Sequence, residues 1–152
     1  MAGALTIRLA AEADRESWER LWRGWQQHMA GSVPDDITER CWQTMMLPDS
    51  GLWAVLAFAE HQPLGFANVS RTPFAWTAEP VVFLQDLYVD PQARGRGIGS
   101  ALLQGVYAHA DAIGAPQVFW MVDEDDPELQ AFYQRHAIRT PYNRYMRRDW
   151  PW

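Results

Sequence analysis

A glycine-rich segment with two arginines stands in the middle of the 152-residue sequence, where residues 94–100 read Arg-Gly-Arg-Gly-Ile-Gly-Ser. Glycines let successive main-chain N–H groups converge on one point, and a helix that begins here adds a partial positive charge. Arg94 and Arg96 add two fixed cations. The segment therefore predicts a site for a phosphate or pyrophosphate group, and the alternative is a tight strand-to-helix connection without a ligand.

Two common phosphate motifs are excluded by the same residues. The sequence contains no lysine, so a lysine-containing P-loop and a Schiff-base lysine are both impossible. The glycine spacing also departs from the dinucleotide fingerprint, since its third glycine falls at Ser100 or Leu102. The anion must then be held by another kind of loop.

Composition narrows the partners further. The net charge of −6 disfavours nucleic acid and anionic membranes, and it favours small cations. Cys41 is the only cysteine, which excludes an internal disulfide and fits a reducing compartment. The four histidines lack metal-ligand spacing, and the longest apolar run, residues 52–59, is far shorter than the ~20 residues of a membrane helix. We expect a cytoplasmic protein without a metal, nucleic-acid or membrane partner.

Hydrophobic periodicity predicts the elements that position the loop. A strand, a glycine-rich turn, a helix and another strand imply a right-handed crossover, so we expect one α/β domain over residues 1–152 with helices packed on a mixed sheet. Asp14 is the expected N-cap of the first helix, and Asp35 or Asp36 that of the second. The predicted strands are 5–10, 52–59, 64–70, 81–89, 117–122 and 142–147, and the predicted helices are 15–28, about 36–47, 97–113 and 127–135.

Two motifs resemble one known family. Residues 84–99 are similar to the core motif of the GCN5-related N-acetyltransferase (GNAT) superfamily, in which Arg94, Gly97 and Gly99 match Arg/Gln-x-x-Gly-x-Gly. Residues 126–133 resemble its Asn-x-x-Ala-x-x-Phe-Tyr helix. The closest similarity is to the small diamine/polyamine and Hpa-type acetyltransferases. The resemblance implies a mixed, mostly antiparallel sheet that is flanked by about four helices and splayed between the third and fourth central strands.

The resemblance also implies an activity. It indicates transfer of acetyl from acetyl-coenzyme A to a primary amine, such as a small amine, a polyamine or an amino acid, by direct attack. Two alternatives remain: a non-catalytic acyl-coenzyme A binding module, and a polyanion-binding module that uses the arginine-rich C-terminal region. Relatives often form dimers, and Trp150-Pro151-Trp152 could be buried against a partner chain in a homodimer.

Cofactor residues follow from the resemblance alone. The main chain near Leu87 and Val89 is implied to pair with the pantetheine arm, and the Leu87 amide to polarise the thioester. The loop amides are implied to hold the pyrophosphate. The implied cofactor-binding residues are Leu87, Tyr88, Val89, Arg94, Gly95, Arg96, Gly97, Ile98, Gly99, Ser100 and Asp126.

The residues implied to act in catalysis match the family pattern to different degrees. Tyr133 matches the family tyrosine that protonates the leaving thiolate, and the alternative for Tyr133 is aromatic packing. Gln85 stands where several relatives carry glutamate, and its amide could only orient a water or the substrate. Asp86 is another candidate base, although strand alternation places it on the opposite face from Gln85 unless a bulge intervenes. The other nearby carboxylates are Asp123 and Glu124.

The first helices carry tryptophans at helical spacing, beside carboxylates. Aromatic faces and carboxylates could bind an ammonium group, but a tryptophan stripe of this kind is more typical of a core. The residues concerned are Trp18, Trp22, Trp25, Trp42, Asp35, Asp36 and Glu39.

Overall fold

A computed structural model describes residues 3–148, which divide after Phe119 into two compact units. The first unit is built on a five-stranded sheet whose strands follow one another in chain order. Its first four strands pair antiparallel, and the fifth is parallel to the fourth. The strands are β1 (Leu5–Leu9), β2 (Leu52–Ala59), β3 (Gln62–Thr72), β4 (Val81–Val89) and β5 (Val118–Phe119). The expected mixed, mostly antiparallel sheet is confirmed.

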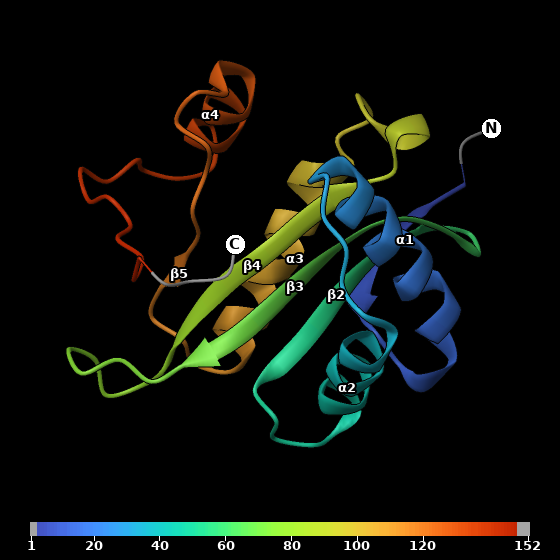
Figure 1. Cartoon of the computed structure of the whole chain (residues 1–152), viewed down its shortest axis with the longest axis horizontal. Helices are drawn as coiled ribbons and strands as arrows, with labels where there is room; N and C mark the ends of the chain where they lie inside the picture. The colour runs from blue at the N-terminus through green and yellow to red at the C-terminus, as the bar shows by residue number, and fades with distance from the viewer. Residues whose placement is uncertain (1–2, 149–152) are drawn as a thin grey trace. The chain divides into compact units, whose positions relative to one another are not determined.

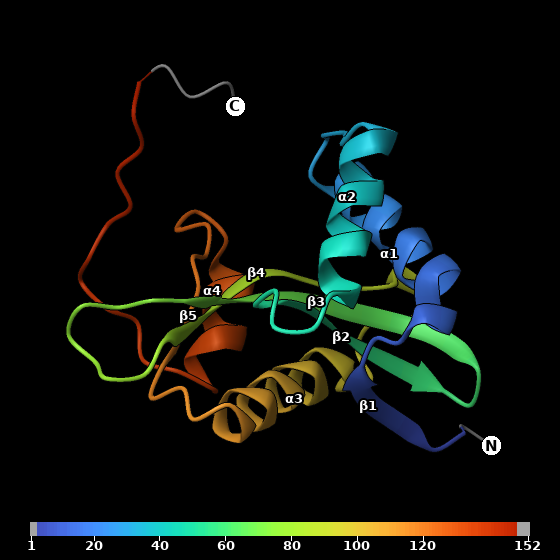
Figure 2. The same ribbon diagram turned by 90° about the horizontal axis from the view of Figure 1, so that it is seen from below.

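Helices cover both faces of this sheet (Figures 1 and 2). The helices α1 (Arg15–His28) and α2 (Asp35–Met46) lie on one face, and α3 (Ile98–Ala112) lies on the other. Short 3-10 turns, η1 (Glu12–Asp14) and η2 (Pro91–Ala93), precede α1 and α3. No helix among residues 3–148 is long and apolar enough to cross a bilayer.

Aromatic side chains fill the core between the sheet and the first two helices. Trp18 is fully buried and its ring centroid lies 5.3 Å from that of Trp42 and 5.8 Å from that of Trp22. Phe66 and Tyr88 extend the same cluster from the sheet. The core interpretation of the tryptophan stripe is therefore confirmed.

The acidic residues near the helix starts behave differently from the expectation. Asp14 makes no capping hydrogen bond to α1, because its carboxylate binds the Arg8 guanidinium at 2.6 and 2.9 Å. Asp35 and Asp36 lie inside the first turn of α2, whose N-cap is Pro34. Asp14 therefore stands at the predicted N-cap position of α1 without making a side-chain cap, whereas the prediction of Asp35 or Asp36 as the N-cap of α2 is wrong because the helix begins one residue earlier, after Pro34.

An irregularity in β4 decides the geometry of the site. The pairing register moves from Val69↔Leu84 to Asn68↔Asp86, so Gln85 is the extra residue of a β-bulge. On the other edge, β5 pairs with β4 only at Val82 and Phe83. The predicted strand over 117–122 is thus shortened to two residues, and the splay expected between these strands is present.

The second unit, residues 120–148, contains α4 (Pro127–Gln134). Pro127 occupies the first turn and the Asp126 carboxylate accepts a hydrogen bond from the Leu129 amide at 2.9 Å. The strand predicted at 142–147 is wrong, since these residues have no regular secondary structure and Tyr142 and Tyr145 are almost fully exposed. The suggested partner contact at Trp150-Pro151-Trp152 lies outside the described residues.

Candidate functional site

The glycine-rich turn connects β4 to α3 through an open main-chain path. Gly95 and Gly97 have φ angles of +74° and +77°, in the left-handed region that favours glycine. A Cβ atom added to either glycine would meet nothing within 4 Å. Ala101 donates to the Gly97 carbonyl at 3.0 Å, so the amides of Ile98 and Gly99 precede the first intrahelical bond. Small residues, open space and a helix N-terminus thus coincide, as an anion requires.

Side chains brace this turn from both ends. Arg94 donates through Nε to the Val89 carbonyl at 3.0 Å, and its guanidinium lies 5.7 Å from the centroid of the Tyr88 ring. The Asp90 carboxylate accepts from the Gln92 amide at 3.0 Å. Arg96 is exposed, whereas the Ile98 side chain is buried in the core. Of the loop side chains, Arg96 therefore has the most freedom to approach a ligand.

The end of β4 presents main-chain groups to the splayed edge. Asp90 donates its amide to the Leu64 carbonyl of β3 at 2.8 Å. Alternation along the strand then directs the polar main-chain groups of Leu87 and Val89 away from β3. The main-chain groups of Tyr88 are directed toward β3 instead. Its ring packs in the core cluster, so Tyr88 contributes packing and no outward main-chain group.

The bulge brings Gln85 and Asp86 to the same face of the sheet. Gln85 donates to the Ser70 hydroxyl at 3.0 Å, while Asp86 accepts from the Asn68 amide at 3.0 Å. Asn68 and Ser70 are two residues apart on β3 and share a face. The alternation rule alone would have separated the two residues, and the inserted residue removes that separation.

Asp86 occupies an unusual environment for a carboxylate. Its Oδ1 accepts from the Trp25 indole N–H at 2.9 Å, and its Oδ2 accepts from Asn68. None of the ion pairs found among residues 3–148 includes Asp86. Burial raises the pKa of Asp86, and the two hydrogen bonds oppose that rise. A partly exposed carboxylate that lacks a cationic partner is suited to accept a proton or to bind an ammonium ion.

Tyr133 lies in the second unit, on α4. Its ring centroid is 5.3 Å from that of Trp120 and 5.0 Å from that of Phe132. Burial raises the pKa of Tyr133 to about 12, so the phenol is protonated at neutral pH. Both interpretations from the sequence therefore remain open for this residue, since its ring packs against aromatic neighbours and its hydroxyl can donate a proton.

The carboxylates of the second unit differ from Asp86 in their surroundings. Asp123 and Glu124 are exposed, and the Asp123 carboxylate accepts from the Asp125 amide at 2.9 Å. Asp126 uses its carboxylate to cap α4. None of the three shares the burial of Asp86.

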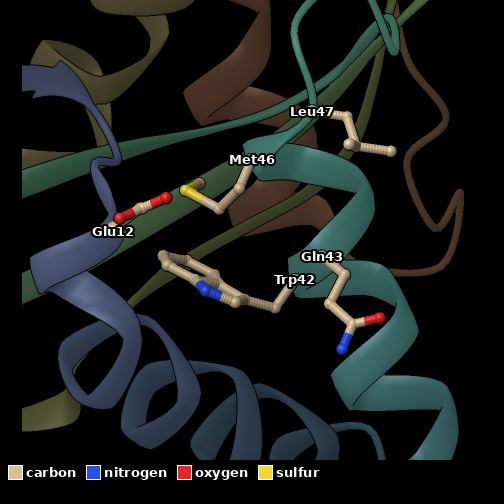
Figure 3. Close-up of a pocket in the computed structure, with 5 residues that line it drawn as sticks. All are labelled: Glu12, Trp42, Gln43, Met46 and Leu47. Atoms are coloured by element: carbon tan, nitrogen blue, oxygen red, sulfur yellow. The ribbon is translucent and has the colours of Figure 1, made fainter.

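A hollow of about 570 Å³ lies beside α2 (Figure 3). It is lined by Glu12, Trp42, Gln43, Met46 and Leu47. Trp42 and Met46 project toward Glu12, and no residue predicted to bind cofactor or to act in catalysis lines it. The acidic residues of the first helices are also engaged elsewhere, since Asp35 pairs with Arg23 at 2.6 Å.

Comparison with known proteins gives the family of the chain. The model of the acetyltransferase (GNAT) family matches residues 12–137. The chain belongs to this family. The whole of α1, the β4 bulge, the glycine turn and α4 all fall within the matched range.

Three relatives illustrate the similarity. A D-amino-acid N-acetyltransferase, HPA3 of Saccharomyces cerevisiae, is 30% identical over 94% of this chain and 90% of its own length. An aminoglycoside N(6')-acetyltransferase type 1 of Stenotrophomonas maltophilia is 36% identical over 71% of this chain and 69% of its own. The structure of aminoglycoside N-acetyltransferase AAC(6')-Iy in complex with CoA superposes with a TM-score of 0.84 at 22% identity, covering 98% and 97% of the two chains.

These findings establish the reaction in general terms. The chain is an acetyl-coenzyme A-dependent N-acetyltransferase with an amine-type acceptor. The open glycines and the first amides of α3 fit the pyrophosphate of coenzyme A.

Sequence reasoning missed one residue of this site. Asn68 is 2% exposed, yet it stands in an otherwise apolar strand and hydrogen-bonds to both Trp18 and Asp86. A single amide among buried apolar residues needs polar partners, and this was the signal that could have revealed it.

Proposed function

We propose that residues 1–152 form a single N-acetyltransferase domain that acetylates the primary amine of a small cationic acceptor, with Asp86 as the general base and Tyr133 as the general acid. The observation that carries the proposal is the Asp86 carboxylate, which is partly buried against neutral donors and one residue from the outward-facing amide of Leu87. A carboxylate in that position can take the proton that a protonated amine must lose before it attacks.

Acetyl-coenzyme A supplies the activated thioester. The amides of Gly97 to Gly99 hold its pyrophosphate, with Arg96 as the cationic side chain nearest in sequence. The outward main-chain groups of Leu87 and Val89 offer strand-like hydrogen bonds to the pantetheine arm. The Leu87 amide donates to the thioester carbonyl and stabilises negative charge on its oxygen.

The reaction balances with two protein groups. Asp86 takes a proton from the acceptor ammonium, directly or through one water, and frees the nitrogen lone pair. The C–N bond then forms as the C–S bond breaks, and Tyr133 protonates the departing thiolate. The nitrogen loses its second proton to water, and water returns a proton to the Tyr133 phenolate, so the net product besides the amide and the thiol is the one proton that Asp86 releases. The raised pKa of Tyr133, about 12, keeps the phenol protonated until the thiolate leaves.

The acceptor class follows from charge and from the relatives. The relatives named above are a D-amino-acid and two aminoglycoside acetyltransferases, and both substrate classes carry amines. The net charge of −6 favours approach of a cation. Amino acids, polyamines and amino sugars are therefore the classes to test.

The test is release of thiol from acetyl-coenzyme A across an acceptor panel, with calorimetry of cofactor binding on the same protein. The panel contains D- and L-amino acids, polyamines, an aminoglycoside and a neutral alcohol as the control. Turnover with one amine class supports the proposal and names the substrate class. Cofactor binding without turnover of any amine would contradict the acceptor assignment, and no binding would contradict the role of the loop.

A further inference from the structure

Asp86 belongs to a chain of four side chains that links α1 to β3 and β4. The Trp18 indole N–H donates to Asn68 Oδ1 at 3.1 Å. Asn68 Nδ2 donates to Asp86 Oδ2 at 3.0 Å, and the Trp25 indole N–H donates to Asp86 Oδ1 at 2.9 Å. Every bond in the chain runs toward the carboxylate.

The direction of this chain is fixed by Trp18. An indole N–H can only donate, so the Asn68 amide must present its oxygen to Trp18. Its NH₂ group is then left facing Asp86, and the amide cannot rotate to offer the carboxyl an acceptor. Both side chains are shielded from water, since the exposed fraction is 0% for Trp18 and 2% for Asn68. Water therefore cannot replace the bond between them.

A neutral carboxylic acid would fit this environment poorly. A protonated Asp86 must donate one hydrogen, but the two groups that contact it, Asn68 Nδ2 and Trp25 Nε1, are themselves donors. The ionised form accepts from both and matches the site. Since the site offers no arginine partner within residues 3–148, these two neutral donors are the groups that compensate for burial of the charge.

We propose that Trp18, Asn68 and Trp25 are positioning residues that hold the proposed base, Asp86, ionised and fixed in orientation for the acceptor ammonium. The inference rests on the function proposed above, because it assigns a purpose to the base. Other titratable groups around Asp86 are Cys41 of α2, which interacts with it electrostatically, Tyr88 of β4, and His28, which stacks on the Trp25 ring at 5.7 Å.

Paired tryptophan variants of α1 test this proposal. Trp25→Phe removes the donor to Asp86, and Trp22→Phe is the matched control. Trp22 packs on the same core cluster and is also partly buried, but its indole donates to the Thr38 hydroxyl at 3.3 Å instead. Trp18→Phe is the second test variant, since it frees the Asn68 amide to rotate without touching Asp86.

Two readouts are measured on the full chain: the carbon-13 NMR titration of the Asp86 carboxyl, assigned with Asp86→Asn, and the acidic limb of the pH profile of kcat/KM. We expect Trp25→Phe to move both upward by about one pH unit, because one hydrogen bond to a charged group is lost. Trp18→Phe should move them in the same direction, and Trp22→Phe should move neither.

The outcomes separate this inference from the proposed function. If the NMR titration of Asp86 is unchanged in both test variants, or moves as much in Trp22→Phe, the positioning role is overturned. If the NMR titration moves as expected and the kinetic limb does not follow, the chain controls the carboxyl but Asp86 is not the base, which overturns the proposed function. If Trp18→Phe fails to fold, Trp25→Phe and its control still decide the question.

Discussion

The two parts of the proposed site in residues 3–119 are held by different kinds of contact. The glycine turn is braced by neighbours in the chain, since Arg94 and Val89 are five positions apart and Gln92 and Asp90 are two. Asp86 is held by Trp25 and Asn68, which are 61 and 18 positions away. The proposed cofactor loop therefore depends on local conformation, whereas the proposed base depends on correct packing of α1 against the sheet. Substitutions in the two regions should change different kinetic constants.

The largest expected effect is at the carboxylate. Asp86→Asn removes the proposed base and should lower kcat/KM by about 10³-fold, within the range of general-base catalysis, while the Kd for acetyl-coenzyme A stays the same. Steady-state kinetics and calorimetry on one preparation measure both constants. The competing carboxylates provide the comparison, since Asp123→Asn and Glu124→Gln should keep kcat/KM near the wild-type value. A loss in either of them as large as that of Asp86→Asn would contradict the assignment.

This carboxylate also marks the limit of prediction from the sequence. Local signals predicted the bounds of α1 and β4 and the helix start after Gly97, because periodicity and turn residues act within a few positions. The sequence could not place Gln85 and Asp86 on one face, since that depends on a bulge set by pairing with β3. The interaction of Asp14 with Arg8 was missed for the same reason, because it is a contact between η1 and β1.

The C-terminal region was predicted least well. The strand predicted at 142–147 is absent, since the structure gives these residues no strand partner within the described chain. The helix α4 was predicted nearly to its last residue, because a capping aspartate and a proline mark its start. The role of Tyr133 came from the family motif and stays a prediction.

Tyr133 offers a second, smaller test, at a ring that packs against aromatic neighbours. Tyr133→Phe keeps the ring against Trp120 and Phe132 but removes the hydroxyl, so we expect kcat to fall by about 10²-fold without a change in the Kd for acetyl-coenzyme A. Measurement of kcat with the preferred amine checks this. Unchanged turnover would leave Tyr133 with the packing role alone.

A substitution in the glycine turn should change cofactor affinity and leave turnover nearly unchanged, the opposite of Tyr133→Phe. Gly97→Ala places a Cβ in open space but at a φ of +77°, a conformation that costs an L-residue roughly 1–2 kcal/mol. We expect the Kd for acetyl-coenzyme A to rise about tenfold, with little change in kcat at saturating cofactor. Gly31→Ala is the matched control, because nothing lies within 4 Å of its added Cβ and it stands outside the turn. An unchanged Kd in Gly97→Ala would show that the cofactor does not depend on this main-chain conformation.

The smallest expected effect concerns His109 of α3, a half-buried titratable group on the opposite face of the sheet from Asp86. His109 packs edge-on against Trp53 at 4.4 Å, and its Nε2 is buried without a hydrogen-bond partner among residues 3–148. Asp86 has two donors that favour its charged form, but the buried Nε2 of His109 has no acceptor among residues 3–148 that would favour an imidazolium. Burial accordingly lowers the pKa of His109 in the folded protein.

The sign of the pH dependence follows from that lowering. Below the pKa of the unfolded state, about 6.5, the unfolded chain binds the proton more readily than the folded chain does. The contribution of His109 to stability is therefore complete above about pH 6.5 and is lost as the pH falls through the lower pKa of the folded state. His109→Leu should remove the part of the acid-induced loss of stability that comes from His109. The loss is measured as the change in the free energy of unfolding in urea between pH 8 and pH 5.5. At pH 8 the wild-type His109 is neutral in both the folded and the unfolded state, so the difference between the two proteins at that pH gives the packing baseline. An equal loss of stability between pH 8 and pH 5.5 in both proteins would assign the acid sensitivity to other groups.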